Sequence, residues 1–285
     1  MERGPGRTCL HHVQRLLFSI PVLVVIAILA LDYYSLVIQS TRERFDRSPV
    51  GAVFLVLIFH ICLILLLVSY YRCIFTNTFV SGHQPPLALR DAVFPNCGKC
   101  GNVKPARAHH CSMCRTCVLK MDHHCPWVAN CVGFHNYKYF CLFIFWSTVS
   151  AWVFVIGSID HLLNLFKGDS VDSPFVSLFA VILTFSFAVT LVGFLIFHLR
   201  LVVTGQTTLE FATTNRDPDW VNPYDCGGKW ENFYAIFGTR WLLWLLPVKT
   251  SQETGFEFQQ IVTSQDLEDG LLSSTAMKSD DNSQE

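Results

Sequence analysis

Charged residues are scarce in this 285-residue chain. They make up 15% of it, whereas an ordinary soluble domain carries about 25%. The chain also has no excess of basic residues, because its formal net charge is -1, so bulk attraction to nucleic acid or to an acidic surface is excluded. Hydrophobic residues, in contrast, account for 51% of the chain. This composition indicates a membrane protein.

The first apolar run, 16–38, lacks the features of a cleaved secretory leader. It exceeds the apolar length of about 7–15 residues that signal peptides use, it contains Pro21 and Asp32, and it has no small-residue cleavage site. We therefore expect it to stay in the protein as a membrane span. A bilayer takes about 20 residues to cross, and three further apolar runs are long enough: 51–71, 139–159 and 175–197.

Four spans place both termini and the connection 72–138 on one side of the membrane. That connection is rich in lysine and arginine, whereas the connection 160–174 holds Lys167 alone beside three aspartates. Because short basic connections stay in the cytosol, we expect both termini and 72–138 to be cytosolic. The exceptions to this pattern are three arginines in the first outer loop: Arg42, Arg44 and Arg47.

Seven of the twelve cysteines lie in the short stretch 97–131, where histidines alternate with them. A disulfide scaffold is typical of short exported chains, so thiols mixed with imidazoles indicate metal ligation in a reducing compartment. The stretch repeats itself at an offset of fourteen residues, and each copy supplies the four Cys or His ligands of a tetrahedral structural zinc. The two predicted sites are Cys97, Cys100, His110 and Cys117, and Cys111, Cys114, His124 and Cys131.

A sequential division of the ligands stays open at this point. It would place Cys97, Cys100, Cys111 and Cys114 in one site, and Cys117, a histidine, Cys125 and Cys131 in the other. The pattern also leaves open the choice between the two neighbouring histidines of each copy. The repeat favours the interleaved division, in which Cys125 binds no metal.

A free Cys125 would have a histidine and an acid beside it. A cysteine nucleophile reacts as its thiolate, and a neighbouring histidine lowers its pKa or takes its proton. An acid commonly orients that histidine. We therefore expect Cys125 to be the nucleophile, His123 the base and Asp122 the orienting acid; the first copy has Ala108 in the place of Asp122. Closed zinc sites offer no open position, so the metal would keep the segment rigid.

The position of this thiol, close before the third span, predicts a substrate at the cytosolic membrane face. Its electrophile would combine a polar head with an apolar tail. Fatty acyl-CoA fits this description, and attack on its thioester would give an S-acyl enzyme. The thiol of a client protein with a membrane-proximal cysteine could then take the acyl chain.

The segment resembles the cysteine-rich domain of the DHHC protein S-acyltransferases (palmitoyltransferases) in its four-span setting and in the stretches "HHC", "KMDHHCPWV" and "CVGFHNYKYF". The resemblance implies palmitoyl transfer from acyl-CoA, the interleaved zinc ligands, and the roles of Asp122, His123 and Cys125. Supporting residues are implied where the family motifs match: Thr207, Thr208 and Glu210 for Thr-Thr-x-Glu, and Asn232 for the C-terminal asparagine. The family's common Asp-Pro-Gly stands here as Thr76-Asn77-Thr78.

Four residues are candidates for binding acyl-CoA. Trp127 would form a wall near the thioester, Phe140 and Phe143 would line a cavity for the tail, and Lys138 would meet the CoA phosphates. Core packing, or anchoring at the membrane for Lys138, is the alternative for each. Asp32, near the outer end of the first span, either limits the length of the acyl chain or reaches the interface.

The predicted architecture is an all-α polytopic membrane protein with a zinc-binding insert between the second and third spans. Its parts are the N-terminus with two spans (1–71), the cysteine-rich domain (72–138), two further spans (139–198), a C-terminal region with an interfacial segment (199–248) and a disordered tail (249–285). The expected location is the Golgi or the endoplasmic reticulum, with the plasma membrane as the alternative. A membrane-anchored zinc-binding scaffold or ubiquitin-ligase-like adaptor is the rival function.

Overall fold

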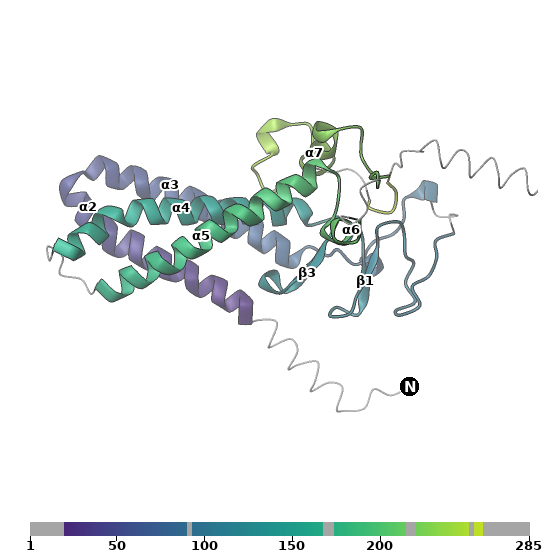
Figure 1. Ribbon diagram of the computed structural model, residues 1–285, viewed down its shortest axis with the longest axis horizontal. Coiled ribbons are helices and arrows are strands. Elements are labelled where there is room, and N and C mark those ends of the chain that lie inside the picture. The colour runs from purple at the N-terminus through teal and green to yellow at the C-terminus, as the bar shows by residue number, and fades with distance from the viewer. Residues whose placement is uncertain (1–19, 90–92, 168–173, 215–219, 251–253, 259–285) are drawn as a thin grey trace, which may run out of the picture.

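Four long helices form an elongated bundle (Figure 1), and the computed structural model describes residues 20–89, 93–167, 174–214, 220–250 and 254–258. All four helices are long and apolar enough to cross a membrane, which confirms the predicted four-span architecture. The first predicted span began at residue 16, and its part before residue 20 lies outside the described residues. The helices are Ile20–Arg47, which ends in the π-helix η1 (Tyr34–Ser40) and α2 (Thr41–Arg47), then α3 (Pro49–Phe75), α4 (Tyr137–Lys167) and α5 (Pro174–Val203).

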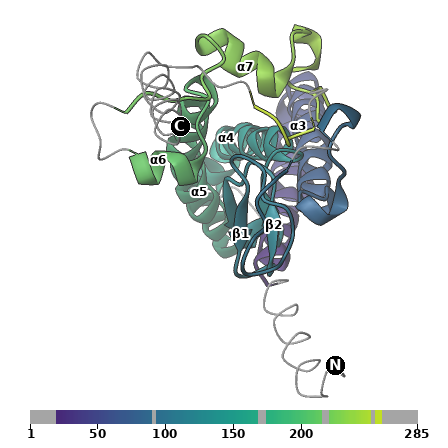
Figure 2. The same ribbon diagram turned by 90° about the vertical axis from the view of Figure 1, so that its right-hand side faces the viewer.

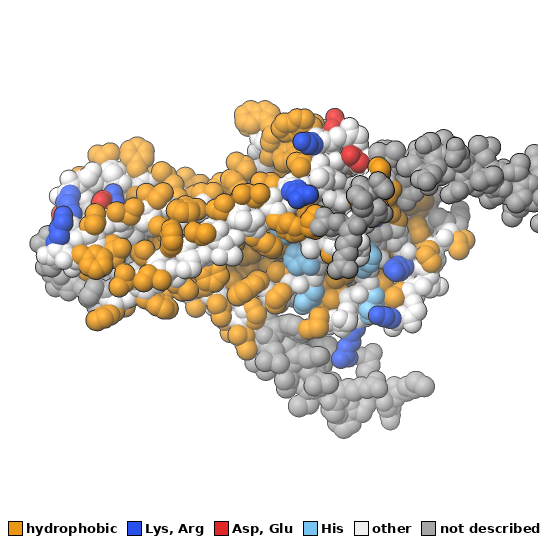
Figure 3. Space-filling view, viewed as in Figure 1, with side chains coloured by type: hydrophobic (Ala, Val, Ile, Leu, Met, Phe, Trp, Pro, Cys, Tyr) orange, Lys and Arg blue, Asp and Glu red, His pale blue; other side chains and the backbone are white. Residues whose placement is uncertain are grey.

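Hydrophobic side chains cover the outside of the bundle, and charged side chains gather at its two ends (Figure 3). Along α3, for example, Phe54, Ile61 and Ile64 are all more than half exposed. An apolar surface of this extent is unfavourable in water and favourable against lipid. The helix begins at a polar cap, where the Ser48 hydroxyl accepts a hydrogen bond from the Gly51 N–H.

Each helix runs beyond the apolar run that predicted it, and the first one extends to Arg47 because its polar end is bonded to α4. Arg44 donates to the Gly157 carbonyl at 3.1 Å and pairs with Asp160 at 2.8 Å. Arg47 donates to the Asn164 side chain at 3.0 Å. Two of the arginines that depart from the charge pattern therefore have partners inside this end of the bundle.

The segment between α3 and α4 adds two short β-hairpins to the helical fold (Figure 2). Strand β1 (His109–Cys111) pairs with β2 (Thr116–Val118), and β3 (His123–Cys125) pairs with β4 (Asn130–Val132). The register is the same in both hairpins and sets a histidine opposite a cysteine: His110 faces Cys117, and His124 faces Cys131. The sequence repeat is thus also a structural repeat.

Two buried asparagines fasten this segment to the end of α3. The Asn130 side-chain amide donates to three carbonyls at this end, those of Cys73, Ile74 and Thr76, at 3.1–3.2 Å. The Asn136 amide donates to the Cys73 carbonyl at 3.2 Å and to the Cys131 carbonyl at 2.9 Å. These bonds satisfy carbonyls that the helix end leaves without intrahelical partners, so they fix the second span against the segment.

The stretch Thr76-Asn77-Thr78, where the family often has Asp-Pro-Gly, contributes to the same junction. The Thr78 hydroxyl is completely buried and donates to the Cys131 carbonyl at 3.4 Å. The Thr78 carbonyl accepts a hydrogen bond from the Leu119 N–H at 3.1 Å. In this chain, Thr76-Asn77-Thr78 is therefore part of the connection between α3 and the hairpins.

The C-terminal region folds back against the bundle and the hairpins through α6 (Thr208–Thr214), α7 (Lys229–Phe237) and the turn η5 (Trp241–Leu243). Residues 254–258 also return to the hairpins, where Phe256 is 2% exposed among Val80, Cys97 and Leu119. These five residues belong to the predicted disordered tail 249–285, and Phe256 buries apolar surface that the polar average of the tail conceals. The rest of the tail beyond 258 lies outside the described residues.

Candidate active site and metal centres

Two groups of four Cys and His side chains could each hold a metal ion, and they are the interleaved groups predicted from the repeat. Within each group the ligand atoms lie within 4.8 Å of one another. In the second group the His124 Nδ1 lies 3.4 Å from the Cys114 sulfur and 3.5 Å from the Cys131 sulfur. A tetrahedron with bonds of about 2.3 Å to the metal has edges of roughly 3.8 Å, so the spacing suits zinc.

The sequential division of the ligands does not match this arrangement. Cys97 and Cys100 are grouped with His110 and Cys117, and Cys111 is grouped with the second site. Cys125 belongs to neither group. Both sites would be closed by four protein ligands, so a zinc ion in either would support the hairpins and leave the chemistry to other side chains.

Asp122 and His123 form a short hydrogen-bonded pair next to Cys125. The His123 Nδ1 lies 2.6 Å from the Asp122 Oδ2, and the Asp122 side chain is 1% exposed. Burial disfavours the charged carboxylate, but the hydrogen bond and the charge of His123 outweigh it, so the pKa of Asp122 is below its ordinary value. The charged carboxylate is therefore favoured beside the imidazole.

The other partner of His123 is the thiol of Cys125. Burial opposes the charged imidazolium, but hydrogen bonds to Asp122 and to Cys125, together with their charges, raise the pKa of His123 to about 9. A histidine in this state is a cation at neutral pH and stabilises a neighbouring thiolate. Cys125 is buried at the end of strand β3, and His123 begins that strand, so the strand fixes the spacing of these two side chains.

An apolar cavity of about 480 Å³ opens beside this group and runs into the bundle between the helices. His123, Cys125 and Trp127 line its end near the hairpins, and Phe140 and Phe143 line its side, so these predicted acyl-chain contacts do face one cavity. Asp32 and Thr184 also line the cavity. The Thr184 hydroxyl donates to the Asp32 carboxylate at 2.7 Å, so the pair presents a polar group inside a mainly apolar space.

Lys138 does not line this apolar cavity. Its side chain is 7% exposed, and its ammonium donates to the Leu243 carbonyl at 2.9 Å and to the Thr250 hydroxyl at 3.3 Å. These bonds tie the C-terminal region to the start of α4 and leave the ammonium turned into the protein. Lys138 also lines a second pocket together with Arg107, Lys120 and Lys249, and its contact with CoA phosphates stays a prediction.

The Thr-Thr-x-Glu motif supports the buried aspartate directly. The Thr208 hydroxyl donates to the Asp122 Oδ2 at 2.7 Å, and the Thr208 N–H donates to the Oδ1 at 2.9 Å. Glu210 accepts from the Thr207 N–H at 2.9 Å, and the Glu210 N–H donates to the Thr207 hydroxyl at 3.2 Å. The motif is thus a capped turn that aims two donors at one carboxylate.

Arg107 is a supporting residue that the sequence interpretation did not single out. Its guanidinium makes two bonds to Glu210, at 2.7 and 2.6 Å, and one to the Gly205 carbonyl at 2.7 Å. Burial raises the pKa of Glu210, but the bonds and charge of Arg107 outweigh it and hold that pKa below its ordinary value. The guanidinium also lies over the rings of Tyr224 and Phe258, 4.5 and 5.1 Å from their centroids.

Asn232, matched to the family's C-terminal asparagine, holds the chain together behind this turn. Its amide donates to the Val203 carbonyl at 3.1 Å and to Asp225 at 2.9 Å, while its oxygen accepts from the Cys226 N–H at 2.9 Å. Asn232 is 2% exposed. It supports the end of α5, from which the Thr-Thr-x-Glu turn begins.

The fold and the site together define a multi-pass membrane protein with two Cys/His metal centres and a buried Asp–His–Cys group at the mouth of an apolar cavity. The family model described as DHHC palmitoyltransferase matches residues 95–215. "Probable protein S-acyltransferase 12" of Arabidopsis thaliana is 33% identical over 279 residues, covering 87% of this chain and 94% of the relative. "Palmitoyltransferase ZDHHC15A" of Danio rerio is 32% identical, covering 88% and 87%, and "Palmitoyltransferase ZDHHC15" of Homo sapiens is 29% identical, covering 86% and 83%. The chain belongs to the DHHC palmitoyltransferase family.

Proposed function

We propose that the protein transfers a long-chain acyl group, typically palmitoyl, from acyl-CoA to cysteines of client proteins through an S-acyl intermediate on Cys125. One observation carries the proposal. Among the seven cysteines of 97–131, Cys125 is the one that both metal groups leave out, and it lines the apolar cavity with His123 and Asp122 beside it. Family membership supports the same chemistry.

In the first half-reaction the Cys125 thiolate attacks the carbonyl carbon of the acyl-CoA thioester. The bond from that carbon to the CoA sulfur breaks, and the leaving thiolate takes the proton held by His123. In the second half-reaction a client thiol gives its proton to His123 and attacks the acyl-enzyme, and the Cys125 thiolate leaves. Each half-reaction exchanges one thioester for another, so ping-pong kinetics are expected.

The cavity supports a tail of long-chain length. It runs along α4 from Phe140 to Ala151, which at 1.5 Å per residue is roughly 16 Å. An extended chain advances about 1.2 Å per bond, so this distance suits roughly fourteen carbons. Asp32 and Thr184 are proposed to limit the length at the far end of the cavity.

The basic connection 72–138 supports a cytosolic position for the hairpins, where acyl-CoA and client cysteines are available. We propose the same side for both termini, and a Golgi or endoplasmic reticulum membrane as the setting. The clients would be proteins whose cysteines lie close to the membrane, because Cys125 sits where the hairpins meet the bundle.

The test is acylation of the purified full-length protein with labelled palmitoyl-CoA. We expect hydroxylamine-sensitive label on the wild type and none on Cys125→Ser, with two zinc ions bound in both. Cys226→Ser is the matched control, because Cys226 is an exposed thiol away from the cavity and its loss should leave the label unchanged. Full label on Cys125→Ser with both zinc ions retained would refute the proposal and favour a zinc-binding scaffold.

A further inference from the structure

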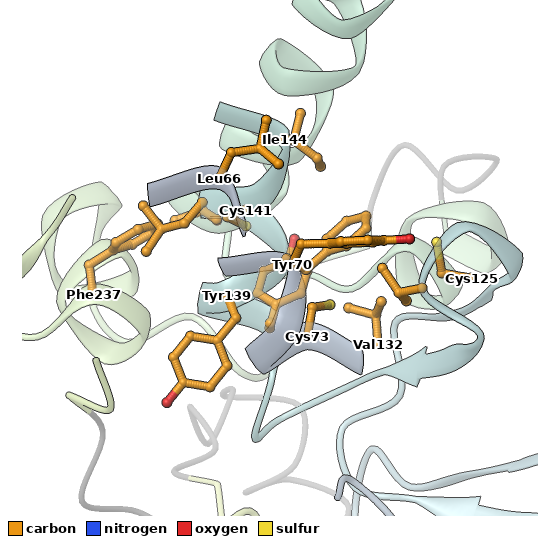
Figure 4. Close-up of a cluster of buried hydrophobic side chains, with 14 residues drawn as sticks. Leu66, Tyr70, Cys73, Cys125, Val132, Tyr139, Cys141, Ile144 and Phe237 are labelled. Atoms are coloured by element: carbon orange, nitrogen blue, oxygen red, sulfur yellow. The ribbon is translucent and has the colours of Figure 1, made fainter. Parts of the chain in front are cut away.

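Tyr70, on α3, is a buried side chain that the proposed reaction does not use. Its side chain is 4% exposed, and its hydroxyl donates a hydrogen bond of 2.7 Å to the backbone carbonyl of Trp127, two residues after the nucleophile. Tyr70 and Cys125 belong to one buried cluster, and Figure 4 shows the Cys125 sulfur at the edge of that cluster nearest Tyr70 and Val132. The second span therefore reaches the catalytic turn directly.

The ring of Tyr70 makes a second contact of consequence. It stacks on Phe143 of α4, with ring centroids 4.7 Å apart and an angle of 22° between the planes. Phe143 and Trp127 both line the apolar cavity, as does Cys125. One side chain thus holds two walls of the cavity at the end where the thiol lies.

The turn that Tyr70 holds has few bonds of its own. It is the single 3-10 turn η4 (Pro126–Val128), in which the proline has no N–H to donate, and it closes with an Ala129 N–H to Pro126 carbonyl bond of 3.2 Å. Ala129 adopts a left-handed conformation, with φ of 47°, which a residue with a side chain adopts only when its surroundings impose it. An outside bond at Trp127 is therefore well placed to decide where the turn sits.

We propose that Tyr70 is a positioning residue for the acyl transfer: it fixes the Trp127 and Phe143 walls at the Cys125 end of the cavity, so that the thioester carbonyl is held against the Cys125 thiol. This inference rests on the proposed function. No hydrogen bond of the described residues joins Tyr70 to His123 or Asp122, so the Asp122–His123 pair forms without it. What depends on it is the distance and angle between the thiol and a substrate lying along Trp127 and Phe143.

The substitution Tyr70→Phe keeps the stacked ring and removes the hydroxyl alone. At saturating palmitoyl-CoA we expect the rate constant for acyl-enzyme formation to fall about three- to tenfold, in line with the loss of one buried hydrogen bond, while the apparent KM stays within about twofold. Alkylation of Cys125 by iodoacetamide, followed at the Cys125 peptide by mass spectrometry, should also stay within about twofold. Iodoacetamide is small, so its reaction does not depend on the position of these two walls.

Tyr139→Phe is the matched control. Tyr139 is 5% exposed and lies in the same cluster, but its hydroxyl accepts from Arg72 at 3.2 Å, and Figure 4 shows it pointing away from Cys125. An unchanged acylation rate in Tyr70→Phe overturns the inference. A parallel fall of acylation, alkylation and zinc content also overturns it, because it would assign Tyr70 to general stability. Absence of label on wild-type Cys125 would instead defeat the proposed function itself.

Discussion

Removal of the Thr208 hydroxyl tests the support of the buried Asp122 carboxylate most directly. Thr208→Val keeps the shape of the side chain and the backbone bond to Asp122, but removes the 2.7 Å bond to the Oδ2 that also accepts from His123. Asp122 is 1% exposed, so water has little access to replace the lost donor. The variant should therefore form the acyl-enzyme more slowly while still folding.

The size of the effect follows from the charge of the acceptor. A hydrogen bond to a charged group contributes about 1.5–3 kcal/mol, and about 1.4 kcal/mol corresponds to a factor of ten in rate. If all of this hydrogen-bond free energy is lost in the transition state, the reaction would slow roughly 10- to 150-fold. Because the Thr208 N–H still holds the Oδ1 at 2.9 Å, we expect the lower end, about tenfold.

The assay is single-turnover formation of the acyl-enzyme at saturating labelled palmitoyl-CoA, with the zinc content measured on the same samples. Thr213→Val is the control, because that exposed hydroxyl bonds only to the carbonyls of Leu209 and Glu210 in its own helix. Its rate should match the wild type. A Thr208→Val rate within twofold of the wild type, with two zinc ions bound, would refute the assigned role of the hydroxyl.

Three further predictions concern the ion pair, the metal and the cavity. Glu210→Gln should cost about 3 kcal/mol of stability, because it leaves Arg107 without its buried anion. Since the pKa of Glu210 is lowered from 4.5 in the folded protein, the advantage of the wild type in thermal unfolding should be full above pH 4.5 and should shrink as the pH falls through the lowered pKa. A difference that stays constant with pH would contradict this. Chelation should remove both zinc ions and abolish acyl-enzyme formation although no ligand is catalytic, so a metal-free protein with full label would be the contrary result. Asp32→Ser should raise the use of stearoyl-CoA over palmitoyl-CoA several-fold in competition, Asp32→Asn should resemble the wild type, and an unchanged ratio would remove Asp32 as a limit on chain length.

Ligand spacing and apolar length were the features that sequence alone could interpret. Continuous apolar runs predict the four spans, and a fixed offset in the sequence predicts the metal ligands, so both can be recognised along the chain. The same holds for Asp122, His123 and Cys125, because strand β3 carries the histidine and the cysteine and Asp122 directly precedes it. Their predicted roles depend on neighbours within three residues.

Contacts between distant segments were not readable in this way. Arg107 meets Glu210 across 103 positions, and Tyr70 meets Trp127 across 57, and neither pair has a spacing rule. Lys138 is a further example: its two oxygen acceptors, on Leu243 and Thr250, lie 105 and 112 positions away in the sequence. Charge is visible in a sequence, whereas the satisfaction of charge is decided by tertiary structure.

The overlap of the two zinc-binding copies has a consequence for where a reactive thiol can arise. His110 and Cys111 are adjacent but belong to different metal centres, so the copies interlock and cannot be separated into two one-zinc modules. In the first copy, the thiol that follows the histidine pair is Cys111, and the next copy uses it as a ligand. After the last copy no further copy follows, so the equivalent thiol, Cys125, is not used as a metal ligand. A third copy would convert the proposed nucleophile into a ligand. The proposed chemistry therefore belongs to the end of the array, and the number of repeats determines where that end lies.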